Sequence, residues 1–375
     1  MKFRKGDDDA VVCRLKEIRT QKGLTQAHLA EAAGIKRQAV YDIESGKYLP
    51  NTAVALKLAK SLNCRVEDIF YETSPEKDPQ VTLVADNQSG KGKRLTLVKV
   101  RDKLLGYPLE NGISAGQGIQ AADGLLSSCG EKARLLCDRK YLDKTVLLPG
   151  CDPAFSLLAS YVMRMPGEER LLWRFASSYR ALTYLASGQA HIAGIHLHNT
   201  GSGESNADAA RKILSCSGRL IGFTVFEEGL MVAPGNPLNI RGIEDLGRKD
   251  VRLANREPGA ALRILLDDCL ERAGIPAEAV RGYHHRVGSH LEGAQQVMFK
   301  QADATPGLRA VSLSCGLDFV PLTAVRCDLV IPEDMFDLSA VQVMMDVLQS
   351  KSFRHELAVL PGYETGCTGK VIAEI

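Results

Sequence analysis

Residues 24–50, LTQAHLAEAAGIKRQAVYDIESGKYLP, decide the fold of the N-terminal part of this chain. Thr25 is a suitable N-cap for a first helix, because its hydroxyl can accept a bond from a free backbone N–H of the first turn. Gly34 supplies the sharp turn that separates this helix from a second one. The stretch therefore predicts two short helices joined by a tight turn. Apolar residues recur at helical spacing and can close one small core, at Leu29, Ala30, Ala33, Ile35, Val40 and Ile43.

The second of these helices has an exposed polar face made of Lys36, Arg37, Gln38, Tyr41 and Asp42. In the DNA major groove, Arg pairs with guanine and Gln with adenine through two hydrogen bonds each. Between residues 14 and 65, ten Lys or Arg stand against four Asp or Glu, so this segment carries +6 while the full chain carries +2. Concentrated positive charge in a small domain is typical of phosphate binding. DNA binding is therefore favoured over the alternatives, a solvated face of a helical bundle or a protein-interaction module.

Residues 14–70 resemble the XRE (Cro/repressor-like) helix-turn-helix transcriptional regulators. The matching segments are LKEIRTQKGLTQ, LAEAAGI, VYDIESGKYLPN, LKLAKSLN and VEDIF. The resemblance implies an all-α five-helix head that is braced by a buried ion pair between Arg19 and Glu44. It also implies the DNA contacts: Gln26, Lys36 and Lys47 at or near phosphates, and Arg37, Gln38 and Asp42 at base edges, with Tyr41 on the same face.

The length of 375 residues predicts a multidomain protein of two or three domains. We expect the helix-turn-helix head over residues 11–72, a linker over 73–80, a small β-rich connector over 81–143 and an α/β domain over 144–375. The polar first ten residues are expected to be loose. No apolar run reaches 18 residues and the N-terminus lacks the apolar core of a secretory signal, so we expect a cytoplasmic protein without a membrane span. Ten thinly spread cysteines without a CxxC pair fit reduced thiols.

From residue 144 onward, short apolar strands alternate with amphipathic helices. Such alternation predicts an α/β domain with mostly parallel sheets. The domain is long enough for two lobes joined by extended crossover strands, lobe I over residues 144–228 and 326–375 and lobe II over 229–325. Helices are predicted over residues 153–164, 179–187, 207–214, 259–273, 290–300 and 306–314.

This part of the chain resembles the type II periplasmic-binding-protein fold, in the branch related to molybdate-binding proteins. The matching segments include SSYRALTYLASGQAHIAGIHLHNTGSGESN, GLMVAPGNPLNIRGIEDL, NREPGAALRILLD, QADAT and GLDFVPL. The resemblance implies a two-lobed, periplasmic-binding-protein-like ligand domain for a small molecule, either an oxyanion such as molybdate or tungstate or a small anionic metabolite. Where the family usually has Ser, Gly and Thr, this chain has Ala260, Ala261 and Leu262. The loss of two hydroxyl donors weakens the case for molybdate or tungstate itself.

Candidate ligand residues lie where predicted helices start after strands. Ligands in open α/β sheets bind beyond the carboxyl ends of strands, and helix starts present free N–H groups to anions. The alternatives are plain helix caps for Asp152, Ser177, Ser289 and Thr305, a solvent-facing Arg263 and a core histidine at position 196. No Cys or carboxylate stands at ligand spacing from the histidines, so we expect no metal site. The candidates are Cys151, Asp152, Ser177, Ser178, Arg180, His196, Gly259, Ala260, Arg263, Ser289, His290 and Thr305.

Together these features predict a one-component transcription regulator that binds operator DNA, senses a small molecule and acts as a homodimer, without a cofactor. An enzyme is the second class considered, but the sequence has no G-x-S-x-G motif and no P-loop. A third class is a DNA-binding protein whose C-terminal domain is only an oligomerisation or scaffold module without ligand.

Overall fold

The chain divides into two units, Met1–Gln80 with Lys132–Arg134, and Val81–Glu131 with Leu135–Ile375. The computed structural model describes residues 2–4, 10–73, 78–84, 93–109, 120–128, 130–197 and 205–375. Half of the predicted linker, residues 74–77, lies outside these ranges. The β-rich residues that we expected to form a separate connector are, apart from three, part of the second unit.

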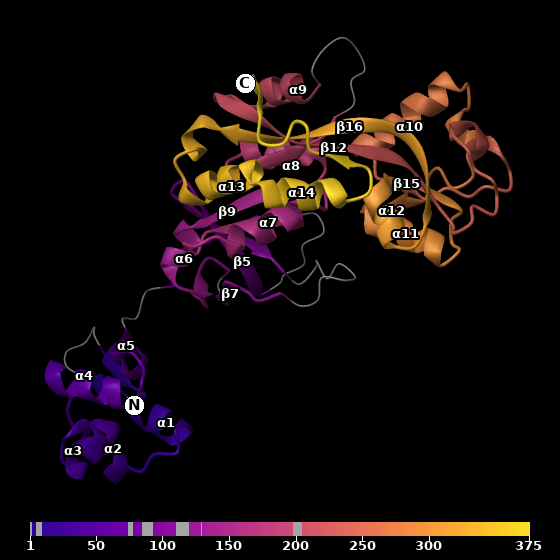
Figure 1. Ribbon diagram of the computed structural model, residues 1–375. Helices are drawn as coiled ribbons and strands as arrows, with labels where there is room; N and C mark the ends of the chain where they lie inside the picture. Colours follow the sequence, from indigo (N-terminus) through magenta and orange to yellow (C-terminus); the bar gives the residue numbers. More distant parts are fainter. Residues whose placement is uncertain are drawn as a thin grey trace. The chain divides into compact units, whose positions relative to one another are not determined.

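The first unit contains the five predicted helices around one core (Figure 1). Thr25 caps α2 by accepting a hydrogen bond from His28 N, and Gly34 ends that helix with φ at 63°. The core includes the fully buried Leu15, Val40 and Leu58. The helices are α1 (Leu15–Gln21), α2 (Gln26–Ala33), α3 (Arg37–Glu44), α4 (Thr52–Ser61) and α5 (Val66–Ile69).

The first unit is not wholly helical, which corrects the prediction. The strands β1 (Lys2–Arg4), β2 (Ala10–Cys13) and β3 (Phe70–Thr73) form an antiparallel sheet in the order β1-β2-β3. The expectation that the first ten residues are loose is therefore wrong for Lys2–Arg4. The segment Lys2–Arg4 has three residues, of which only one is apolar, and a pattern this short does not predict a strand. Its pairing partner is the apolar AVVC segment of β2.

The β-rich segment of the second unit shares its core with the first lobe. Val98 and Tyr107 of β5 and β6 are buried in the same cluster as Leu148 and Phe155. A buried ion pair between Arg170 and Asp123, with Nη1 and Oδ1 2.7 Å apart, also joins the two parts. The elements are β4 (Thr82–Leu83), β5 (Arg94–Val100), β6 (Lys103–Pro108), β7 (Gly124–Leu126), β8 (Ala133–Leu135) and α6 (Arg139–Asp143).

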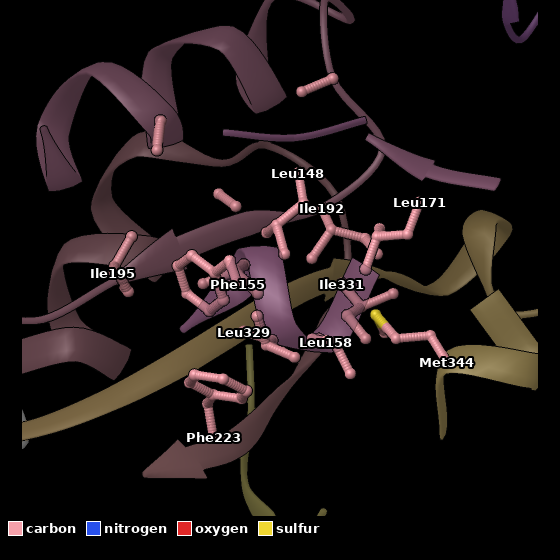
Figure 2. Close-up of a cluster of buried hydrophobic side chains, with 14 of the residues drawn as sticks. Leu148, Phe155, Leu158, Leu171, Ile192, Ile195, Phe223, Leu329, Ile331 and Met344 are labelled. Atoms are coloured by element: carbon pink, nitrogen blue, oxygen red, sulfur yellow. The ribbon is translucent and has the colours of Figure 1, made fainter. Parts of the chain in front are cut away.

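The first lobe places helices on both sides of its strands (Figure 1). Figure 2 shows its core, where the ring of Phe155 lies 4.7 Å from that of Phe223. A Cβ at Gly194 would come within 2.3 Å of the Phe155 ring, so this close approach requires glycine. The elements are β9 (Thr145–Gly150), α7 (Phe155–Arg164), β10 (Arg170–Phe175), α8 (Ser178–Ala186), β11 (Ala193–Ile195), α9 (Ser205–Ile213), α13 (Ser339–Gln349) and α14 (Lys351–Val359).

Two long strands, β12 (Gly218–Val232) and β16 (Asp318–Pro332), join the lobes. They pair antiparallel from Gly218↔Pro332 to Val232↔Asp318, and β11, β15, β17 (Tyr363–Glu364) and β18 (Val371–Glu374) flank them, also antiparallel. The predicted crossover strands are confirmed, but the prediction of mostly parallel sheets is wrong. Short apolar runs do not encode direction, and a chain that leaves a lobe on one strand and returns on its neighbour pairs antiparallel. Among the described strands, the parallel pairs are β4 with β6, β9 with β10, and β13 (Asn255–Arg256) with β14 (Arg286–Val287).

The second lobe is smaller and has its own two clusters of buried apolar side chains. One predicted helix starts later than expected, because Thr305 and Pro306 belong to β15. This strand lies at the edge of its sheet, where proline is tolerated. The elements are β13 (Asn255–Arg256), α10 (Ala261–Arg272), β14 (Arg286–Val287), α11 (His290–Met298), β15 (Ala304–Leu308) and α12 (Arg309–Ser314), with short 3-10 helices at Ile243–Gly247, Ala277–Ala279 and, in the first lobe, Glu333–Met335.

Candidate functional site

The polar face of α3 forms one connected group of side chains. Asp42 accepts hydrogen bonds from Gln38 Nε2 at 2.9 Å and from Lys47 Nζ at 2.8 Å. The bond from Lys47 lowers the pKa of the Asp42 carboxyl. Lys47 also lies 5.1 Å from the centre of the exposed Tyr41 ring. Two of the side chains that we predicted to meet bases, Gln38 and Asp42, are thus already held in place on the protein surface.

The remaining DNA-binding candidates have different surroundings. Lys36, the N-cap residue of α3, and Arg37, its first residue, are exposed. Gln26 is half-buried, and its Nε2 donates to Glu44 Oε2 at 2.8 Å. The predicted ion pair between Arg19 and Glu44 is confirmed, with Nε and Oε1 2.6 Å apart. The roles of Gln26, Lys36 and Arg37 at DNA stay predictions.

A second candidate site is a group of buried polar side chains at the ends of strands in the second unit. Cys151 and Asp152 follow β9, His196 follows β11, and Glu228 lies on β12. In the second lobe, Arg256 lies on β13, His290 starts α11, and Thr305 lies on β15. All seven are buried. We call this set the polar cluster: Cys151, Asp152, His196, Glu228, Arg256, His290 and Thr305.

His196 lies between two polar neighbours, Cys151 in the first lobe and Glu228 on the strand β12, which joins the lobes. Its Nδ1 is 3.2 Å from Cys151 Sγ, and its Nε2 is 3.1 Å from Glu228 Oε1. Burial alone opposes a charge on the imidazole, but Cys151 and Glu228 together raise the pKa of His196 well above its usual value. Ser178 holds the backbone of His196 from both sides, because its hydroxyl accepts from His196 N and donates to His196 O.

Asp152 is fully buried, yet only one of its oxygens is bonded. Oδ1 accepts from Tyr363 Oη at 2.6 Å and from Ala154 N at 2.8 Å. Oδ2 has no partner among the described residues. Burial raises the pKa of Asp152 to about 6, although both hydrogen bonds oppose the shift. A carboxyl group in this state can accept or donate a hydrogen bond near neutral pH.

The second lobe contributes a cation and two unpartnered polar atoms. Arg256 Nη1 lies 3.4 Å from His290 Nδ1, and its guanidinium is 5.8 Å from the ring centre of Phe175, which ends β10 in the first lobe. Burial and the charge of Arg256 lower the pKa of His290. His290 Nε2 and Thr305 Oγ1 have no partner among the described residues. Buried polar atoms without a partner cost free energy, so a missing partner is expected.

Several predicted ligand residues have structural roles here. Ser289 caps α11 by accepting from Glu292 N. Arg263 is buried against the Tyr283 ring and donates to Asp267, so it does not face solvent. Arg180 is exposed and lies 5.5 Å from the ring centre of Tyr184. Ser177 is the N-cap residue of α8 without a side-chain cap bond, Gly259 has φ at 86° before α10, and Ala260 is the N-cap residue of α10.

Sequence reasoning missed Glu228 and Arg256 as site residues. Glu228 lies in the apolar strand GRLIGFTVFEEGLMV, where a charged residue is itself a signal. The preceding Glu227 gives the same signal, and only strand register decides which of the two is buried. Arg256 belongs to the NR motif that we quoted for the fold. No group of three or more His, Cys, Asp or Glu in the described ranges is placed to hold a metal ion.

Comparison with known proteins places both units. Residues 159–349 match a family described as the PBP superfamily domain, and residues 15–69 match one described as helix-turn-helix. The protein YvgK of Bacillus subtilis is 34% identical over 233 residues, which cover 61% of this chain and 74% of YvgK. The HTH-type transcriptional regulator YgzD of the same species is 40% identical over 58 residues, 16% of this chain and 88% of that protein.

Solved structures similar to this chain include a phosphate-bound putative phosphate transporter substrate-binding protein of Clostridium perfringens. It is 13% identical, covers 57% of this chain and 96% of its own, and has a TM-score of 0.44. Across the parts of the chain that the structure describes, no helix is long and apolar enough to cross a bilayer.

Proposed function

Because the chain belongs to the PBP superfamily and carries a helix-turn-helix domain of transcriptional regulators, we propose that it is a one-component regulator in the cytoplasm. Its first unit binds operator DNA, and its second unit binds a small molecule. The observation that carries the ligand half is the polar cluster, in which Asp152 Oδ2, His290 Nε2 and Thr305 Oγ1 are buried without partners among the described residues.

The DNA half rests on charge and on the arrangement of α3. The exposed Arg37 and Gln38 can pair with base edges, while Lys36 and Lys47 neutralise phosphates. Operators usually carry two half-sites, so we propose a homodimer. Ligand-driven movement of the lobes would change the arrangement of the two heads. A difference of ~1–3 kcal/mol between the two states changes operator affinity roughly 5–150-fold.

The charges of the polar cluster favour a small metabolite over a bare oxyanion as the ligand. The carboxyl groups of Asp152 and Glu228 repel an oxyanion when they are ionised. Arg256, which also pairs with Glu257 at 3.2 Å, attracts an acidic group. A ligand with a hydrogen-bond donor at one end and an acidic group at the other satisfies both. This metabolite class agrees with the loss of hydroxyl donors at residues 260–262.

The DNA half is tested by selecting bound duplexes from a random pool and titrating the selected operator. Arg37→Ala should lower discrimination at one base pair by ~1–3 kcal/mol, while Lys47→Ala should weaken all sequences alike and reduce the salt slope by about 1. Lys57→Ala, an exposed lysine on α4, is the matched control and should change neither. If Arg37→Ala keeps the full sequence preference, α3 is not the reading helix. If no duplex is retained at low salt, the DNA-binding proposal fails.

The ligand half is tested by thermal unfolding with carboxylic acids, amino acids and oxyanions. The single tryptophan, Trp173 on β10, reports on the second unit by fluorescence. A ligand at a hundredfold excess over its Kd stabilises by ~2.7 kcal/mol. Thr305→Val should reduce that shift, whereas Thr183→Val, an exposed threonine on α8, should leave it unchanged.

The second candidate function is a DNA-binding protein whose second unit is a ligand-free oligomerisation module. The specific observation in its favour is the run Ala260, Ala261 and Leu262, which offers no side-chain donor at the start of α10. Under this alternative, no compound shifts the unfolding of the second unit, and deletion of that unit abolishes both dimerisation and tight operator binding.

A further inference from the structure

We propose that Cys151, His196 and Glu228 form a nucleophilic thiol site that takes a ligand with an electrophilic carbonyl carbon, such as an aldehyde or a 2-oxo acid. This inference deepens the proposed function, because the thiol belongs to the polar cluster in which the effector would bind.

The first argument is the close contact of His196 with both Cys151 and Glu228. Glu228 Oε1 lies 3.1 Å from His196 Nε2, and His196 Nδ1 lies 3.2 Å from Cys151 Sγ. Sγ also lies 3.9 Å from His196 Nε2. At these distances the imidazole can take the thiol proton, and the carboxylate can stabilise the imidazolium that forms. A nucleophile, a base and a group that orients the base are the three parts of an activated nucleophile.

The second argument is that the three residues are held by separate elements. Cys151 follows β9, His196 follows β11, and Glu228 is part of β12. Ser178 fixes the His196 backbone at both N and O, and the Phe226 ring packs edge-on at 5.1 Å from the imidazole. A buried cysteine that only fills space needs neither a base nor a carboxylate. Cys327, which is also buried, has no histidine within hydrogen-bond distance among the described residues.

The third argument is that several buried polar atoms of the polar cluster lack partners among the described residues. Asp152 follows Cys151 directly and leaves Oδ2 without a partner among the described residues, as do His290 Nε2 and Thr305 Oγ1. Asp152 and His290 lie close enough to His196 for its charge to act on them, because His196 lowers the pKa of each. These atoms can bind the oxygen atoms of a ligand whose carbon faces Sγ.

The reaction is a reversible addition without a redox change. Cys151 Sγ forms a bond to the carbonyl carbon, the π electrons of the C=O bond move to its oxygen, and the thiol proton passes through His196 Nδ1 to that oxygen. The product is a hemithioacetal or hemithioketal, nothing leaves, and the reverse step releases the ligand unchanged. A sensor needs this reversibility, because its effector must dissociate when the concentration falls.

The test uses the full-length protein and measures iodoacetamide alkylation of each cysteine by peptide mass spectrometry between pH 5.5 and 9. Cys216, which is exposed, is the internal control. A histidine in contact with a thiol can take up its proton as the sulfur attacks, which increases the rate of the thiol as a nucleophile. We expect Cys151 to react ~10-fold faster than Cys216 at pH 6.5.

Variants distinguish the activation of the Cys151 thiol from the folding of the second unit. His196→Gln and Glu228→Gln should bring the Cys151 rate at pH 6.5 below that of Cys216, while Trp173 fluorescence shows that the second unit remains folded. The profile is also shaped by the titratable groups that face the site, Asp152, His290, Cys327 and Tyr363, so Asp152→Asn is measured in parallel. If wild-type Cys151 reacts no faster than Cys216 at pH 6.5, the thiol is not activated and the proposal is wrong.

The ligand class is tested by protection with propanal and with glyoxylate. We expect millimolar concentrations of at least one of them to slow alkylation of Cys151 and leave that of Cys216 unchanged. If neither protects Cys151, the carbonyl proposal is wrong, while ligand-dependent stabilisation of the Cys151→Ser variant would leave the sensor function intact. If instead protection occurs without any change in operator affinity, the thiol site stands and the sensor function fails.

Discussion

Substitution of Arg19 by Met should unfold the first unit selectively. The Arg19 guanidinium donates Nε and Nη2 to the two oxygens of Glu44, at 2.6 and 3.1 Å, and Nη1 to Leu24 O at 2.7 Å. The side chains are 12% and 3% exposed, so the pair is nearly desolvated. Removing one partner of such a pair costs ~3–5 kcal/mol, because the other charge is left buried. In the variant, Gln26 would be the remaining side-chain donor to Glu44.

Whether the first unit stays folded depends on how this loss compares with its free energy of unfolding. A domain of about 60 residues is stable by only ~3–9 kcal/mol at the usual ~0.05–0.15 kcal/mol per residue. Each kcal/mol moves the Tm of a domain this small by about 4–8 °C. The variant should therefore lose about 12 °C or more in the unfolding of the first unit, and with it operator binding.

Two spectroscopic probes distinguish the unfolding of the first unit from that of the second. Far-UV circular dichroism follows all helices, whereas fluorescence of Trp173 follows only the second unit. The matched control is Arg14→Met, which removes an arginine from an exposed pair with Glu17 and should have little effect. The double variant Arg19→Met/Glu44→Met should regain much of the loss, because no charge is left buried. The reasoning is refuted if Arg19→Met and Arg14→Met unfold at the same temperature, or if the tryptophan transition moves as well.

Two further predictions concern the second unit. Gly194→Ala places a methyl group 2.3 Å from the Phe155 ring, and such overpacking should lower stability by ~1–3 kcal/mol in urea unfolding, whereas Gly366→Ala, with open space around it, should not. Burial raises the pKa of Asp152 from 3.8 to about 6, so the folded state holds its proton more tightly than the unfolded state. Stability from this group is therefore full below pH 4 and is lost as the pH rises to about 6, by roughly 3 kcal/mol. Asp152→Asn should abolish this part of the pH dependence, and equal pH profiles for wild type and variant would contradict it.

The sequence predicted local structure well wherever the signals lie close together in the chain. Thr25 and Gly34 bound the observed helix Gln26–Ala33 on either side. Five of the six helices predicted after residue 144 start within two residues of the observed ones. The sixth fails at Thr305, because a proline near a helix start and a proline in an edge strand look alike in sequence.

The polar cluster was predicted only in pieces. Cys151 and Asp152 were candidates because they follow a predicted strand, and His196 was a candidate because it lies on one. Their pairing was not predictable, because it depends on which strands are neighbours and on the register of the strand that carries Glu228. Arg256 was known only as part of a motif, and its approach to Phe175 of the other lobe depends on how the lobes pack.

By itself, the sequence determined the helix-turn-helix head, its positive charge and the alternation of strands and helices, since capping, periodicity and net charge are properties of neighbouring residues. Only the tertiary structure decided that the long strands pair antiparallel and that Cys151 and Glu228 both contact the buried His196. The two contacts of His196, with Cys151 and with Glu228, join residues that are 45 and 32 positions apart in the chain. They depend on sheet order and register, which no local pattern of side chains encodes.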